Sequence, residues 1–267
     1  MTSMSKIRNF KLLLLFSGAF FLSCTVKESR TECPCHLEIG LDAFANVSPT
    51  ATVEIGDASG TVLESRTMDF AAGKVFRADI PPRDYTLCIF VSGEKTDRDG
   101  QTLLVRPGDQ ADSIYAFWMQ LDGRGNEQIR TEAVPHKQFA CVTLLATHTV
   151  ERTAGAVYTV RSDTGGLNLN PLRPSRQRDL SFRTDLSSGT AAFRLTRQDP
   201  ESRLTLLMDD GIRPVAEFPL GEWIRDSGYD WTAEDLDDIV VDLDFSSGKV
   251  FIEIPGREAT TQPVFDL

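Results

Sequence analysis

Apolar and polar residues alternate over most of the chain, and this alternation predicts β-strands. In the segment 36–42, Leu37, Ile39 and Leu41 are apolar and the residues between them are mostly polar. A period of two is the mark of a strand that buries one face. Segments of this kind recur about every ten residues, a spacing that is typical of a β-sandwich.

The predicted strands fall into two groups, and turn-forming residues separate them. The segment 85–91 is apolar enough to be buried on both faces, and the glycine-bounded turn 56–60 predicts a hairpin. Short helices are predicted at 220–225 and near 234–238. The first group of strands comprises 36–42, 51–55, 61–63, 74–80, 85–91, 101–105, 113–119 and 128–134. The second group comprises 138–145, 156–161, 179–184, 190–195, 203–208, 239–245 and 249–254.

This pattern predicts an all-β protein with two sandwich domains. Pro135 interrupts the chain between the two groups of strands, so we place the domain boundary at 133–136. The N-terminal sandwich is predicted to span residues 35–134, and the C-terminal sandwich residues 135–267. A chain of this length suffices for two modest hydrophobic cores.

The first 23 residues follow the layout of a secretory signal peptide. Three cations, Lys6, Arg8 and Lys11, precede an almost unbroken apolar run from Leu12 to Leu22. That run is too short to cross a hydrocarbon core of about 30 Å as a helix. We therefore expect residues 1–23 to direct export and to be removed, and the mature chain to have no transmembrane helix.

A cysteine, Cys24, stands at the predicted cleavage point. The residues before it, 20–23, resemble a lipobox with Phe21 where leucine is commonest. Acylation of the thiol would hold the protein in a membrane, because each buried CH₂ contributes about 0.8 kcal/mol. We therefore predict that Cys24 is the lipid-bearing N-terminus and that residues 24–34 form a spacer. The alternative is ordinary cleavage near Ser23, which would leave Cys24 as a free thiol.

The chain is acidic. It has 28 Lys and Arg against 39 Asp and Glu, a formal net charge of −11. The leader holds three cations and no acidic residue, so its removal changes −11 to −14. A surface of this charge repels nucleic acid and anionic head groups, and no Lys/Arg-rich stripe offsets it. We therefore expect no nucleic-acid partner.

The remaining cysteines are candidates for disulfides. An even number in an exported chain permits two bridges with three connectivities. The segments 36–42 and 85–91 are both predicted core strands of one domain, so we expect Cys88 to pair with Cys33 or Cys35. Zinc is not expected, because the Cys33–Cys35 spacing is too close and no second pair closes a tetrahedron. The four disulfide candidates are Cys33, Cys35, Cys88 and Cys141.

Motifs of catalysis are absent from the sequence. There is no G-x-S-x-G elbow and no G-x-x-x-x-G-K phosphate loop. The histidines His36, His136 and His148 are isolated and are assigned to exposed strands or loops. We therefore predict that the protein is not an enzyme and that it has neither a cofactor nor a catalytic metal.

Two acidic segments and two aromatic segments have alternative interpretations. Residues 97–100, Asp-Arg-Asp-Gly, resemble half of a calcium loop but lack the glutamate that completes one, so we interpret them as a turn. The acidic residues 234–238 are interpreted as a solvated helix start, where carboxylates favour the positive end of the dipole. The aromatic residues at 117–118 and 223–231 are assigned to a core or a domain seam instead of a carbohydrate platform.

Several motifs resemble one family. Cys24, a short spacer and Cys33-Pro34-Cys35 opening an alternating strand are similar to the start of fimbrium-anchoring subunits of Bacteroidota. The segment 81–87 resembles the proline-glycine-tyrosine turn of transthyretin-like sandwiches, with Asp84 where glycine is usual. The residues of 220–239 and 248–255 resemble the family's second domain.

This resemblance implies two transthyretin-like β-sandwiches in tandem and a non-catalytic role. Such a protein sits in the outer membrane through acyl chains on Cys24 and is exposed at the cell surface. It anchors the base of a fimbrium and influences its assembly and length, and its partner is the shaft subunit, a fimbrillin. The rival interpretation is a cell-surface lipoprotein that binds a glycan or a host protein.

The C-terminal tail, 259–267, follows the last predicted strand and has apolar residues at its tip, Val264, Phe265 and Leu267. Shaft subunits of related fimbriae polymerise by strand exchange, in which main-chain hydrogen bonds give affinity and alternate side chains give selectivity. One prediction is therefore that the tail contributes to docking the first shaft subunit. The alternative is a tail that folds back on its own sandwich, although Pro263 argues against a long central strand.

Overall fold

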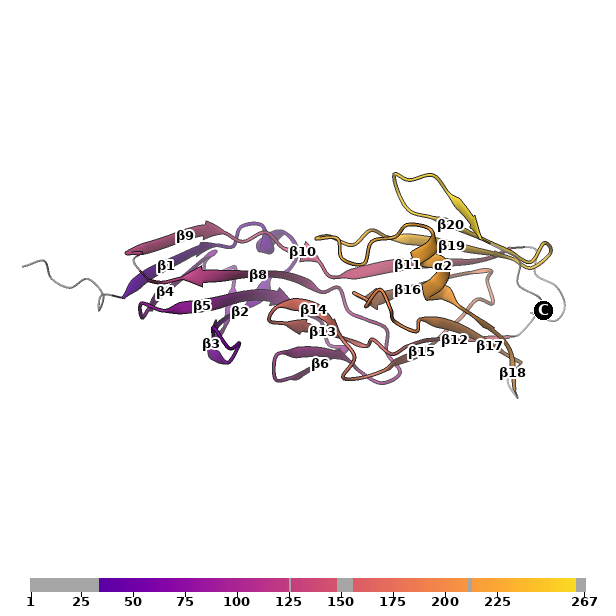
Figure 1. Cartoon of the computed structure of the whole chain (residues 1–267), viewed down its shortest axis with the longest axis horizontal. Helices are drawn as coiled ribbons and strands as arrows, with labels where there is room; N and C mark the ends of the chain where they lie inside the picture. Colours follow the sequence, from indigo (N-terminus) through magenta and orange to yellow (C-terminus); the bar gives the residue numbers. More distant parts are fainter. Residues whose placement is uncertain (1–33, 125, 148–155, 211–212, 263–267) are drawn as a thin grey trace, which may run out of the picture.

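Two β-sandwiches follow one another along the chain and form an elongated molecule (Figure 1). The structure, a computed structural model, describes residues 34–124, 126–147, 156–210 and 213–262. The predicted fold class, an all-β protein with tandem sandwiches, is confirmed. Within the described ranges, no helix has the length and apolar character needed to cross a membrane.

The first sandwich packs a three-stranded sheet, β4-β1-β9, on a five-stranded sheet, β10-β8-β5-β2-β3. Alternate residues of β1, such as Leu37 and Ile39, meet Leu87 and Ile89 of β5 in its core. The predicted period of two at β1 is therefore correct. The elements are β1 (Cys35–Gly40), the 3-10 turn η2 (Phe44–Asn46), β2 (Thr50–Asp57), β3 (Val62–Asp69), β4 (Val75–Ile80), β5 (Asp84–Val91), β8 (Tyr115–Asp122), β9 (Gln128–Glu132) and β10 (His136–Lys137).

The second sandwich packs the sheet β16-β11-β19-β20-β21 on the sheet β15-β12-β17-β18. The helix α2 (Leu220–Asp226) lies where the sequence predicts one, and it buries Trp223 and Ile224 in the core of this domain. The strands are β11 (Phe139–Thr147), β12 (Val157–Ser162), β15 (Leu180–Thr184), β16 (Thr190–Thr196), β17 (Thr205–Asp209), β18 (Pro214–Phe218), β19 (Ile239–Asp244), β20 (Lys249–Glu253) and β21 (Thr260–Gln262).

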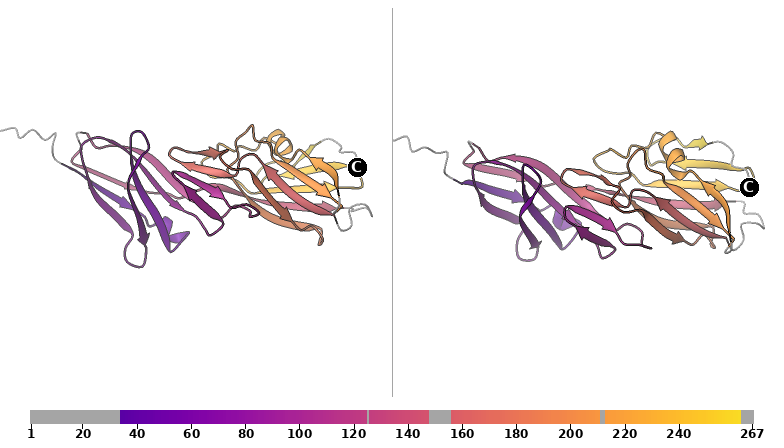
Figure 2. Two further views of the ribbon diagram at one scale, coloured as in Figure 1. Left: turned by 90° about the horizontal axis from the view of Figure 1, so that it is seen from below. Right: turned by 60° about the horizontal axis from the view of Figure 1, so that its bottom comes forward.

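A third sheet, which we call the interdomain sheet, joins the two sandwiches. It consists of two hairpins that are far apart in sequence: β6 (Thr96–Asp99) with β7 (Thr102–Val105), and β13 (Gly166–Leu169) with β14 (Leu172–Ser175). The inner strands pair antiparallel, with Leu167 opposite Leu103. Glycine is required at the contact, because a Cβ on Gly166 would lie 2.8 Å from the carbonyl oxygen of Leu103. Figure 2 shows these hairpins between the two sandwiches.

The interdomain sheet covers the outer face of β5. Cys88 and Phe90 on that face pack with Leu103, Leu167 and Leu169, while the intervening residues of β5 face the first core. The prediction that 85–91 is buried on both faces is therefore confirmed. The second face is buried by residues of both domains, Leu103 of the first and Leu167 and Leu169 of the second.

The chain changes from one sandwich to the next over three residues. His136 and Lys137 still pair with β8 of the first domain, and Phe139 already begins a strand of the second. We refer to residues 136–138 as the linker. The domain boundary placed at 133–136 stays a prediction, and the sheet pairing changes just after it.

Some strands differ from those predicted. The hairpin at 56–60 is present, and Asp57 closes its turn by accepting hydrogen bonds from the Ser59 and Thr61 amides. However, the strand predicted at 61–63 extends to Asp69. The prediction stopped short because the last residues of this strand are mostly exposed and show no apolar alternation. The hairpin β13–β14 and the strand β6 were not predicted, since each is short and polar or contains proline.

Candidate functional site

A buried arginine organises the junction between the two domains. Arg197 follows β16 and is 7% exposed. It donates from Nε to Oε1 of Gln138 at 2.9 Å, from Nη1 to the carbonyl of Trp231 at 2.6 Å and from Nη2 to the carbonyl of Glu234 at 3.1 Å. Burial disfavours the charged form and lowers the pKa of Arg197 from its usual value. The guanidinium therefore ties the linker and the loop 230–238, the junction loop, to the second sandwich.

The junction loop is also held from the linker side. The Lys137 amide donates to Asp235 Oδ1 at 2.6 Å, and the Leu236 amide donates to the Lys137 carbonyl at 3.1 Å. Asp238 accepts the Cys141 amide at 2.9 Å. The helix predicted near 234–238 is therefore wrong. Its carboxylates accept amide hydrogens from the linker and β11 instead of capping a helix of their own.

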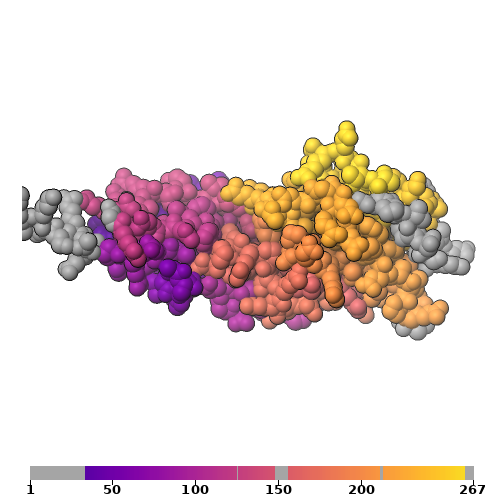
Figure 3. All heavy atoms as spheres, in the orientation of Figure 1, coloured from indigo at the N-terminus to yellow at the C-terminus, as the bar shows by residue number. Residues whose placement is uncertain are grey.

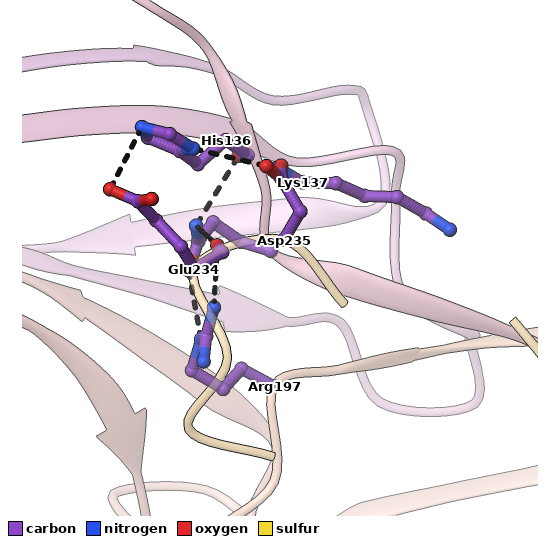
Figure 4. A network of polar contacts seen from close by, with 6 residues as sticks. His136, Lys137, Arg197, Glu234 and Asp235 are labelled. Atoms are coloured by element: carbon purple, nitrogen blue, oxygen red, sulfur yellow. Dashed lines mark hydrogen bonds and ion pairs between the residues drawn. The ribbon is translucent and has the colours of Figure 1, made fainter. Parts of the chain in front are cut away.

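His136 lies between two acidic side chains of the junction loop. Its Nδ1 is 3.2 Å from Asp235 Oδ2 and its Nε2 is 3.3 Å from Glu234 Oε1. The His136 side chain is 18% exposed and that of Glu234 is 79% exposed. Figure 4 shows the junction loop between His136 on one side and Arg197 on the other, with Lys137 directed away from the His136–Glu234 pair.

A cleft of about 290 Å³ opens beside this network. Its walls come from both domains: β8 and the linker supply one part, and the β13–β14 turn, Arg197 and the junction loop supply the rest. The cleft exists because β10 pairs only with Tyr115 and Ala116 of β8. From Phe117 onward, the edge of β8 that faces away from β5 has no described strand beside it. Aromatic, aliphatic and polar groups meet in the cleft, a composition that suits a small organic ligand.

The aromatic residues mostly serve packing, as predicted. Trp223, Tyr229 and Trp231 are buried in the second core. Trp118 packs on the apolar residues between β5 and the interdomain sheet, among them Cys88 and Leu167, which we call the interdomain cluster. Its Nε1 donates to Asn170 Oδ1 at 2.8 Å. Asn170 in turn donates to Thr86 Oγ1 at 2.7 Å, so one side chain of the second domain bonds two strands of the first.

The acidic segment 97–100 is part strand and part turn. Asp97 lies in β6 and accepts hydrogen bonds from Arg106 Nε at 2.8 Å and from Arg178 Nη1 at 2.9 Å. These two bonds hold the pKa of Asp97 below its usual range. Since Arg178 belongs to the second domain, this carboxylate is another tie across the junction. The described residues contain no group of three His, Cys, Asp or Glu side chains suited to a metal ion.

The predicted disulfide between Cys88 and Cys35 is not formed. Cys35 is buried in the core of the first sandwich, whereas Cys88 faces the interdomain sheet on the opposite side of β5. Both are free thiols, as is Cys141, and burial raises the pKa of each. The other proposed partner of Cys88, Cys33, lies outside the described residues, as does the lipidation candidate Cys24.

The C-terminal tail begins as an edge strand. Three residues of β21 pair with β20, with Thr260 opposite Ile252 and Gln262 opposite Val250. The start of the tail thus folds back on its own sheet, which is the alternative given by the sequence. Phe251 beside it is 36% exposed, and Oγ1 of Thr260 is buried without a hydrogen-bond partner. The docking candidates Val264, Phe265 and Leu267 lie outside the described residues.

The histidines contact acidic groups where the structure describes them. His36 Nδ1 contacts Asp79 Oδ1 on an exposed sheet face, and His136 contacts the junction loop. His148 lies outside the described residues. Nothing in the sequence singled out Arg197 or Gln138. The one available signal is a charged residue just after the predicted strand 190–195, and the burial of its neighbours Leu195 and Gln198 is seen only in the structure.

Comparisons with known proteins identify the fold. No protein-family model and no curated sequence matches the chain. Among solved structures, the fimbrial anchor protein Mfa2 from Porphyromonas gingivalis is 12% identical, with a TM-score of 0.59 over 84% of this chain and 98% of that chain. A proposed polysaccharide-binding protein from Bacteroides thetaiotaomicron is 10% identical, with a TM-score of 0.59 over 88% and 99%. A proposed adhesin from Bacteroides ovatus is 9% identical, with a TM-score of 0.59 over 89% and 97%.

At these identities the comparisons establish a shared fold. The structural neighbours include a fimbrial anchor, so the resemblance predicted from the sequence is confirmed at the level of the fold.

Proposed function

We propose that this protein is a non-catalytic anchor that holds a surface fimbrium on the cell. The observation that carries the proposal is the tandem fold, which matches a fimbrial anchor over 84% of this chain and 98% of that chain. The same fold in a proposed adhesin is consistent with a role at the cell surface. Control of fimbrial length and binding of a fimbrillin are finer parts of the same proposal.

The placement of the first and last described strands, β1 and β21, supports this function. The first strand, β1, enters at one end of the elongated molecule (Figure 1). In the second domain, β11 starts at the linker and ends at Thr147, which pairs with Asp244. Asp244 pairs with Lys249, and Val250 pairs with Gln262, so β21 ends on the side far from the linker. A lipid at one end and a docking tail at the other suit an anchor.

The membrane attachment is proposed to be the acylated Cys24. The Cys24→Ala variant should move from the detergent phase to the aqueous phase in phase separation, because the acyl chains supply the membrane affinity. Cys141→Ala is the matched control, since it removes a thiol from the folded second domain. Unchanged partition of Cys24→Ala would disprove lipidation.

Docking of the shaft is proposed to use the tail. We would compare deletion of 263–267, which keeps β21, with deletion of 259–267, which removes it. Both should release fimbriae into the medium and change their length distribution, as seen by electron microscopy. Asp266→Asn controls for the tail while keeping its apolar tip. Normal numbers and lengths of cell-bound fimbriae in both deletions, with the protein still folded and in the membrane, would exclude the tail.

A further inference from the structure

The cleft beside the linker has one apolar wall. Trp118 of β8 is half-buried, and Pro171 and Leu172 of the β13–β14 turn stand beside it. Phe117 also borders the cleft, but its side chain packs on the core of the first sandwich. The hydrogen bond from Trp118 to Asn170 fixes the indole in this position. Trp118, Pro171 and Leu172 therefore offer a preformed apolar surface to a ligand that has an apolar face of its own.

The opposite wall is polar and suits hydroxyl groups. His136 and Glu234 line the cleft 3.3 Å apart, and Oε1 of the 79% exposed glutamate is the atom in contact with His136. Both ring nitrogens of His136 already face carboxylates, whereas most of the Glu234 side chain is exposed. A carboxylate accepts hydrogen bonds and a ligand hydroxyl donates them, so hydroxyls match Glu234.

The cleft is poorly suited to an anion. Arg197 lines the cleft, but it is 7% exposed and directs Nε, Nη1 and Nη2 to protein oxygens. The Lys137 side chain points away from the His136–Glu234 pair and contacts Asp238 (Figure 4). The exposed carboxylate of Glu234 would repel a negative group.

We propose that this cleft binds one ring of a neutral saccharide. The apolar face of the ring packs on the wall formed by Trp118, Pro171 and Leu172, and its hydroxyls donate hydrogen bonds to the Glu234 carboxylate. A volume of about 290 Å³ limits the site to a short piece of a glycan, such as a terminal residue. This binding is separate from the anchoring function, because the cleft lies at the domain junction and the proposed docking tail at the far end.

The test uses the full-length protein in detergent on an array of glycans with neutral pyranose termini. Arrays that end in uronic acids and in free amines form the comparison arms. We expect retention on at least one neutral terminus and none on the acidic ones. Glu234→Gln should weaken that retention about tenfold or more, because it removes a charge-assisted hydrogen bond. Ala233→Arg should abolish it by placing a large side chain in the cleft.

Glu222→Gln on α2 is the matched control and should bind as the unmodified protein does. Thermal unfolding of each variant checks that the fold is kept, and Glu234→Gln is the decisive change because its side chain is exposed. The proposal is overturned if no neutral terminus is retained, if acidic or amine termini are preferred, or if Glu234→Gln and Ala233→Arg both leave binding unchanged.

Discussion

The domain junction and the C-terminal edge are both made of paired strands, yet they are built differently. At the junction, the interdomain sheet buries Leu167 and Leu169 almost completely, and Arg197 has its buried nitrogens bonded. At the edge, β21 pairs over three residues beside the exposed ring of Phe251, and Oγ1 of Thr260 has no partner. Hydrogen-bonded buried polar groups and a buried apolar cluster stabilise the junction. The edge has fewer such contacts, so β21 separates from β20 more easily than the two domains separate from each other.

The largest difference in free energy of unfolding between the two regions should come from removing an apolar side chain in each. Leu169→Ala leaves a cavity in the interdomain cluster and should lower the free energy of unfolding by about 3 kcal/mol. Phe251→Ala, in the exposed edge, should cost less than about 1 kcal/mol. Urea unfolding followed by circular dichroism measures both. Equal losses would remove the contrast between the regions.

Arg197→Met should have the next largest effect. The substitution keeps the apolar stem but removes the donor to the Trp231 carbonyl and to Oε1 of Gln138, so we expect a loss of about 2 kcal/mol. Hydrogen exchange should show the junction loop opening more often. Arg173→Met on the exposed side of β14 is the control and should change stability by less than about 0.5 kcal/mol. A stable Arg197→Met variant would mean that water replaces the guanidinium.

A smaller, pH-dependent effect is expected at Asp97. Arg106 and Arg178 hold its pKa below 3.8 in the folded state, so the folded protein binds fewer protons than the unfolded chain near that pH. Stability therefore rises with pH there, is complete above about pH 5 and is lost as the pH falls through the folded pKa. The difference in unfolding free energy between the unmodified protein and Asp97→Asn should be constant from pH 5 to 7 and shrink below about pH 4. Asp99→Asn is the control, and a difference that persists in acid would refute the tie.

The smallest effect should have the opposite sign. Thr260→Val replaces an unpaired buried hydroxyl with a methyl group of similar shape, and it should stabilise the attachment of β21 by about 0.5 kcal/mol. Hydrogen exchange of the β21 amides, monitored by NMR, should slow accordingly. Thr261→Val changes a neighbouring exposed residue and should leave exchange nearly unchanged. Faster exchange in Thr260→Val would show that the hydroxyl has a partner in solution.

The sequence predicted the strands that carry their own pattern. β1 alternates, and β5 is apolar on both faces, so burial on both faces followed from its composition. Of the covering layer, the segment 101–105 was predicted and forms β7, but the rest did not follow, because β6 reads Thr-Asp-Arg-Asp and β14 contains Pro174. These strands form because two hairpins from different domains pair with each other. The local order of apolar and polar residues does not predict a contact between segments so far apart in the sequence.

The same limit applies to the candidate site. The cysteines looked able to pair because both lie in core strands, but Cys35 and Cys88 face different layers. The acidic residues near 234–238 looked like a helix start, yet Asp235 and Asp238 are used by amides about a hundred residues earlier in the chain. Partners so distant in sequence can be recognised only once the chain is folded.

The direction of the strands in the interdomain sheet determines how the molecule would resist tension. The β7–β13 pair runs along the long axis of the molecule (Figure 1), and the surface is continuous between the two domains, with residues near the end of the described chain, in yellow, projecting from the second domain (Figure 3). A pull between the two ends would therefore load this ladder in shear, so that its hydrogen bonds share the force instead of opening one at a time. Rupture under force depends on the rate of unfolding, and a ladder loaded lengthwise gives the slower rate.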